Sequence, residues 1–121
     1  MSTNELQETF SELKDTFKAY EKVLKIISDK SETYNLNAGY SKKYKRNMYF
    51  GGVEIKKNYV SFYLMPVYVN PKLLEGISPE LKKRMLGKSC FNFKSVDKIQ
   101  LKELSRLTKK GFEFYKKEGL V

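Results

Sequence analysis

Apolar residues recur at alternating spacings of four and three along the first 27 residues. They are Leu6, Phe10, Leu13, Phe17, Tyr20, Leu24 and Ile27. This period places them on one face of a helix. The run Ser2-Thr3-Asn4-Glu5 before them is typical of a capping box. We therefore predict one long N-terminal helix that ends near Ser28-Asp29.

The pattern then changes to the alternation of strands. Residues 30–46 are polar; Tyr34 and Leu36 suggest a short edge strand, and residues 41–46 form a basic loop. Asn47–Lys56 and Tyr59–Val69 are rich in Tyr, Phe and Val and predict two strands. Lys57-Asn58 predicts a tight hairpin turn between them, with Asn58 at positive φ.

Glycine and proline divide the rest of the chain. Gly51-Gly52 inside the first predicted strand indicates a bulge or a close backbone approach. Asn70-Pro71 and Ser78-Pro79 each place a capping residue before a proline, which predicts one turn at 71–75 and a helix at 79–86. GKSCFNFK, residues 87–94, predicts another strand. Asp97, with Gln100 three residues later, predicts the cap of a final helix.

These elements define the expected fold class. One long helix opens the chain, a second closes it, and the predicted strands lie between them. We expect a single α+β domain over residues 1–121, in which an antiparallel sheet carries the N-terminal and C-terminal helices on one face.

Alternation within the strands predicts which side chains share the other face of the sheet. Phe91 and Phe93 are expected beneath the helices. The opposite, amphipathic face is expected to carry Tyr59, Ser61, Tyr63, Met65, Lys88, Cys90, Asn92 and Lys94. Such a face suits a protein partner, a small ligand or a second copy of the chain.

Cys90 is the only cysteine, and the chain has no histidine. Cys–His and Ser–His–Asp catalysis are therefore excluded, as are zinc and copper sites of the usual composition. We interpret Cys90 as a small, half-buried sheet residue. A redox-sensing thiol, favoured electrostatically by Lys88 and Lys94, is the alternative. We expect no enzymatic activity.

Acidic residues recur every three or four positions on the first predicted helix. They are Glu5, Glu8, Glu12 and Asp15. Carboxylate oxygens are ligands for hard cations, so the stripe is a candidate metal site. A solvated helix face, with acids favoured near the helix N-terminus, explains the same pattern.

The charge is strongly positive and uneven. The chain carries a net charge of +10, but residues 1–32 carry seven acids and five bases. A basic body with aromatic strands is a feature of single-strand nucleic-acid and other polyanion binders. Lysine outnumbers arginine, and no RNP or phosphate-loop motif is present, which weakens the case for nucleic-acid binding. No apolar run reaches the length of a membrane span. Without a signal-peptide pattern, we expect a cytoplasmic protein with no membrane partner.

Residues 47–119 also resemble a known family. The strand–Lys-Asn–strand hairpin with Phe62-Tyr63 and Pro66, the Gly-Lys-x-x-x-x-Phe strand at Gly87–Phe93, and a closing helix ending in Gly119 are similar to the YdhG-like family of small bacterial domains. Some members share a frataxin-like two-layer fold and are intracellular iron chaperones. The resemblance implies two helices over an antiparallel sheet. It further implies iron binding by the acids of the first helix and partner docking on the exposed sheet face.

Overall fold

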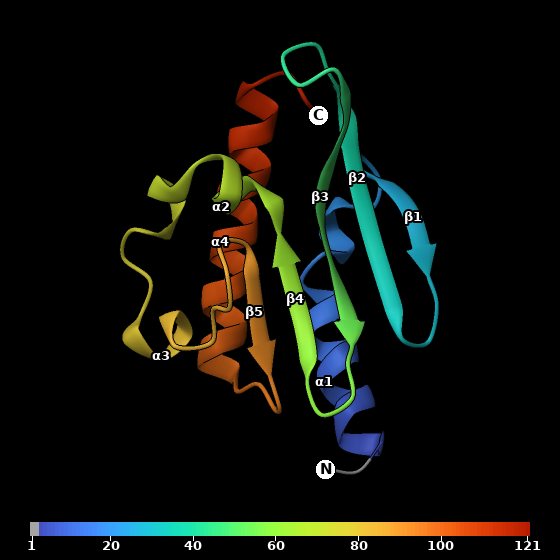
Figure 1. Cartoon of the computed structure of the whole chain (residues 1–121), viewed down its shortest axis with the longest axis vertical. Helices are drawn as coiled ribbons and strands as arrows, with labels where there is room; N and C mark the ends of the chain where they lie inside the picture. Colours follow the sequence, from blue (N-terminus) through green and yellow to red (C-terminus); the bar gives the residue numbers. More distant parts are fainter. Residues whose placement is uncertain (1–2) are drawn as a thin grey trace.

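The computed structural model describes residues 3–121, with side chains from Glu5 onward, and forms two layers (Figure 1). One layer is a five-stranded antiparallel sheet in the order β1-β2-β3-β4-β5. Its strands are β1 (Lys25–Asp29), β2 (Thr33–Ser41), β3 (Arg46–Ile55), β4 (Val60–Leu64) and β5 (Cys90–Phe93). The other layer holds α1 (Thr3–Asp15) and α4 (Lys98–Lys117) on one face of the sheet. This arrangement confirms the α+β class.

The first helix is much shorter than predicted. α1 ends at Asp15, and tight turns and η1 (Lys18–Tyr20) lead into strand β1. Val23, Ile26 and Ile27 are β-branched and favour an extended chain, and pairing with β2 supplies the hydrogen bonds that a helix would have made. Tertiary pairing therefore overrides the helical period. The predicted capping box lies partly outside the described residues.

The middle of the chain also differs from the prediction. β2 is a nine-residue interior strand, not a short edge strand. Met65–Val69 forms helix α2 instead of extending β4. The β3–β4 loop spans residues 56–59, and among the described non-glycine residues positive φ falls at Lys45, not at Asn58. The basic loop of residues 41–46 joins β2 to β3 as expected.

Short elements connect β4 to β5. η2 (Pro71–Leu74) matches the predicted turn, although the Asn70 side chain makes no capping bond. α3 (Pro79–Lys82) is shorter than the predicted helix at 79–86, and the Ser78 hydroxyl caps it by accepting the Leu81 N–H. Gly76 follows η2 with positive φ, whereas Gly87, also at positive φ, lies in the bend before β5 and not at the end of α3.

The final helix follows the prediction closely. Gln100 N donates to Asp97 Oδ1 at 2.7 Å, which caps α4. Gly119, at φ 76°, lets the chain reverse after the helix, and Leu120 turns back into the core. The Leu120 carbonyl accepts the Gly39 N–H at 2.6 Å. The end of α4 is thereby fixed to β2.

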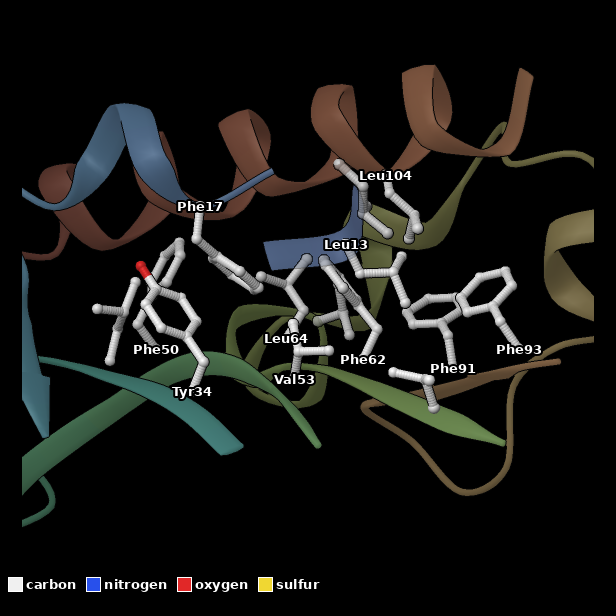
Figure 2. Packing of buried hydrophobic residues seen from close by; sticks show 14 of the residues in the cluster. Leu13, Phe17, Tyr34, Phe50, Val53, Phe62, Leu64, Phe91, Phe93 and Leu104 are labelled. Atoms are coloured by element: carbon white, nitrogen blue, oxygen red, sulfur yellow. The ribbon is translucent and has the colours of Figure 1, made fainter. Parts of the chain in front are cut away.

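Aromatic rings fill the space between the layers (Figure 2). Phe17 stacks on Phe62 with ring centroids 5.0 Å apart and meets Phe50 edge-on at 6.0 Å. Phe91 and Phe93 are fully buried and point toward the helices, as the alternation predicts. Opposite side chains of the same strands consequently face away from the helices.

Candidate functional site

The side of the sheet turned away from α1 and α4 is the candidate functional site. We call it the outer face, and no described helix crosses it (Figure 1). Hydrogen bonds, strand register and alternation assign to it Ser28, Asn35, Tyr49, Gly52, Glu54, Lys56, Ser61, Tyr63, Cys90 and Asn92. Most of these side chains are polar. The outer face is therefore a polar surface, and the aromatic core lies on the opposite side of the same sheet.

A bulge and two glycines shape the centre of the outer face. Leu36 pairs with Gly51 but Asn37 pairs with Tyr49, which leaves Phe50 as an extra residue in β3. A Cβ on Gly52 would lie 2.3 Å from Asn35 Oδ1 and 2.7 Å from the Tyr49 hydroxyl. Only glycine leaves room for these two groups, so the predicted bulge and close approach are both present.

One hydrogen-bonded chain occupies the β1 side of the outer face. The Tyr49 hydroxyl donates to Asn35 Oδ1 at 2.6 Å, and Asn35 Nδ2 donates to Ser28 Oγ at 2.9 Å. Burial raises the pKa of Tyr49, so its hydroxyl stays protonated and remains a donor near neutral pH.

A second cluster occupies the β4–β5 side. Ser61 Oγ and Cys90 Sγ both donate to Asn92 Oδ1, at 2.7 Å and 3.3 Å. Ser61 is 2% exposed, so its hydroxyl depends on this partner. Lys56 Nζ binds Glu54 Oε2 at 2.7 Å beside the cluster.

The thiol in this cluster is not activated. Burial raises the pKa of Cys90. The Ser61 hydrogen bond and the Lys56 charge lower this pKa, but the effect of burial is larger. Thiols react as thiolates, so Cys90 is a poor nucleophile near neutral pH. The arrangement favours the interpretation of Cys90 as a packing and hydrogen-bonding residue.

The predicted docking residues separate into two groups. Ser61, Tyr63, Cys90 and Asn92 meet on the outer face. The remaining four lie outside the two strands: Tyr59 in the β3–β4 loop, Met65 at the start of α2, Lys88 before β5 and Lys94 after it. They fall outside because the predicted strands at 59–69 and 87–94 are longer than β4 and β5.

Lys88 belongs to a different feature. Its Nζ lies 5.9 Å from the Tyr68 ring centroid, and both residues line a hollow of about 520 Å³. Val67, Leu74 and Met85 form its apolar walls. Lys88 therefore lines this hollow rather than the outer face.

Sequence reasoning missed the β1–β3 half of the face. Asn35, Tyr49 and Glu54 belong to strands whose register depends on the bulge. Alternation through β3 would have placed Tyr49 and Glu54 on opposite faces, and the glycine pair was the available signal of the bulge.

The acidic stripe lies on exposed positions of α1. Glu5, Glu8, Glu12 and Asp15 follow one another along this helix, and Asp15 is bound to Lys18 at 3.0 Å. Glu12 and Asp15 also line a hollow of about 230 Å³ against α4. Within the described residues, no three acidic, cysteine or histidine side chains gather as a metal site. The stripe therefore does not form a ready-made ligand cage there.

Comparisons with protein-family models, with curated proteins and with solved structures find no match for this chain. In the described residues, none of the helices combines the length and apolar character of a bilayer span.

Proposed function

We propose that this chain is a non-enzymatic binding domain that docks a partner protein on its outer face. The observation that carries the proposal is the cluster of Ser61, Tyr63, Cys90 and Asn92 on a sheet face with no described helix over it. Hollows of about 400 and 520 Å³ are lined by residues of other regions. The outer face presents mainly polar strand side chains rather than the apolar walls typical of small-ligand pockets, so it suits a protein surface better than a small ligand.

Photo-crosslinking tests this docking surface. p-Benzoylphenylalanine replaces Tyr63 on the outer face or, as a control, Ile99, which is 72% exposed on α4. We expect one discrete adduct from position 63 in cells, and its loss when Asn92→Arg is added. Purified partner must then bind the wild-type chain and not the variant. Identical adducts from both positions would contradict the proposal, whereas an adduct of twice the chain mass would identify a second copy as the partner.

Iron delivery is the specific function that the resemblance adds to this proposal. We propose membership of the YdhG-like family, a frataxin-like arrangement of the two layers, and a cytoplasmic location on that basis. In this version, the α1 carboxylates supply oxygen ligands to iron and the outer face docks the recipient protein. The support consists of the residue pattern of 47–119 and the spacing of the four acids.

Anaerobic titration with Fe²⁺, followed by calorimetry, tests iron delivery separately. Binding tighter than about 1 mM, the weak end for carboxylate sites, is expected. The double variant Glu8→Gln/Glu12→Gln should abolish it, and Glu75→Gln/Glu80→Gln should not. Equal binding by both variants would remove iron delivery and leave partner docking intact.

A further inference from the structure

The turn between β2 and β3 is a second surface, separate from the outer face. We define the hairpin tip as residues 40–46. Lys42, Lys43, Lys45 and Arg46 are all exposed there. No acidic residue occurs between Glu32 and Glu54, so nothing in this stretch of sequence neutralises the four bases. The tip is a concentrated source of positive potential.

The tip also presents aromatic rings to solvent. Tyr40 is 59% exposed and Tyr44 is 44% exposed. Lys43 Nζ lies 5.4 Å from the centroid of the Tyr44 ring, so an ammonium group and an aromatic ring lie side by side at the tip. Neither Tyr40 nor Tyr44 belongs to the aromatic core between the layers.

The backbone fixes this arrangement. The buried Ser41 hydroxyl accepts the Tyr44 N–H at 3.1 Å, and Lys45 adopts φ 56°. A lysine is unfavourable in this left-handed region, where glycine or asparagine is usual. The turn thus holds a lysine at a position where other residues are more stable.

The end of α4 lies at the same end of the molecule as the tip (Figure 1). Tyr44 and Arg46 act electrostatically on Tyr115, although burial has the larger effect on the pKa of that residue. Lys116 and Lys117 follow Tyr115 and are exposed, with Glu118 as the neighbouring acid. The basic surface therefore continues from the tip onto α4.

From these observations we infer that the hairpin tip binds single-stranded nucleic acid. The four bases contact phosphates, while Tyr40 and Tyr44 stack on unpaired bases. A duplex keeps its bases stacked inside, so exposed rings favour a single strand over a duplex. This activity is additional to partner docking and uses none of the outer-face residues.

Fluorescence anisotropy with a labelled oligothymidylate measures this binding directly. The tip variant Lys42→Ser/Lys43→Ser/Lys45→Asn is compared with Lys94→Ser/Lys98→Ser/Lys102→Ser. Both lose three positive charges, but the second set lies at the other end of the molecule. The tip variant should weaken binding by at least about tenfold and make the slope of log affinity against log salt shallower by about 2. The control should bind nearly as well as wild type.

Two further variants separate stacking from charge. Tyr44→Ala should weaken binding by about tenfold, whereas Tyr44→Phe should retain it because the ring remains. Equal losses of affinity in the two triple variants would show that only the net charge of the protein matters, and would overturn the inference. So would binding to the matched duplex as tight as to the single strand, or binding to phosphatidylserine vesicles without binding to the oligonucleotide.

Discussion

The outer face and the hairpin tip both carry tyrosines, but their side chains are used in opposite ways. On the outer face, Tyr49 is half-buried, and its hydroxyl is bonded to Asn35 and lies close to Gly52. At the tip, the Tyr44 ring is exposed beside Lys43. Many polar groups of the outer face are bonded to one another, whereas the charged groups and rings of the hairpin tip are exposed to solvent and can contact a ligand. Changes to the outer face should therefore cost stability in addition to any loss of docking, whereas changes to the tip should alter binding and leave stability nearly unchanged.

The largest expected effect is Gly52→Val at the centre of the outer face. Its side chain would enter the space of Asn35 Oδ1 and the Tyr34 carbonyl oxygen, each 2.3 Å from a Cβ built there. We expect a loss of about 3 kcal/mol in the free energy of unfolding, measured in urea. Gly87→Ala is the control, because its Cβ meets open space and only the positive φ is unfavourable, at about 1 kcal/mol. Equal losses would show that the close approach is unimportant.

Alkaline pH should reveal the buried Tyr49 hydroxyl. Because the pKa of Tyr49 is raised in the folded state, mainly by burial, the folded chain keeps a proton that the unfolded chain releases above its own pKa of about 10. The contribution of the Tyr49 hydroxyl to the free energy of unfolding is thus fully present below that pH and is lost progressively above it. Wild type should lose about 1.4 kcal/mol per pH unit more than Tyr49→Phe in this window. Parallel pH profiles of the two proteins would contradict the assignment.

Removal of one hydrogen-bond partner tests the β4–β5 cluster. Asn92→Ala leaves the buried Ser61 hydroxyl without its acceptor and should cost about 1.5 kcal/mol. Adding Ser61→Ala should cost little more, since the unpaired hydroxyl is then gone. Urea unfolding measures each variant of this double-mutant cycle. Additive losses of free energy would mean that the two residues act independently.

Alkylation of Cys90 measures the reactivity of the same cluster. The raised pKa leaves less thiolate near neutral pH than an ordinary cysteine has, so iodoacetamide should react severalfold more slowly than with a model thiol. Lys56→Met should slow the reaction further, because the Lys56 charge favours the thiolate. Faster reaction than the model thiol would revive the redox-sensor interpretation.

The smallest effect on stability is expected at the tip. Tyr44→Ala and Lys43→Ala remove exposed side chains and should each change the free energy of unfolding by less than about 0.5 kcal/mol. Thermal and urea unfolding measure this directly. A loss near that of Asn92→Ala would remove the contrast between the two surfaces.

Local signals predicted the parts of the molecule that depend on neighbouring residues. The capping box of Asp97 and Gln100 predicted the start of α4, and the Phe91/Phe93 alternation predicted the orientation of β5. Ser61, Cys90 and Asn92 were assigned to one face for the same reason. Alternation in a strand and capping of a helix both act over two or three residues.

Local periodicity, capping and charge were sufficient to predict the α+β class, the closing helix and the basic turn at residues 41–46. The folded chain was needed to show that Lys25–Asp29 is a strand, that Tyr49 joins the outer face, and that the end of α4 lies beside the hairpin tip. These features depend on hydrogen bonds and contacts between residues far apart in the chain. A helical period acts between neighbouring residues and is realised only over Thr3–Asp15, whereas the pairing of β1 with β2 and the bulge at Phe50 depend on the strands beside them.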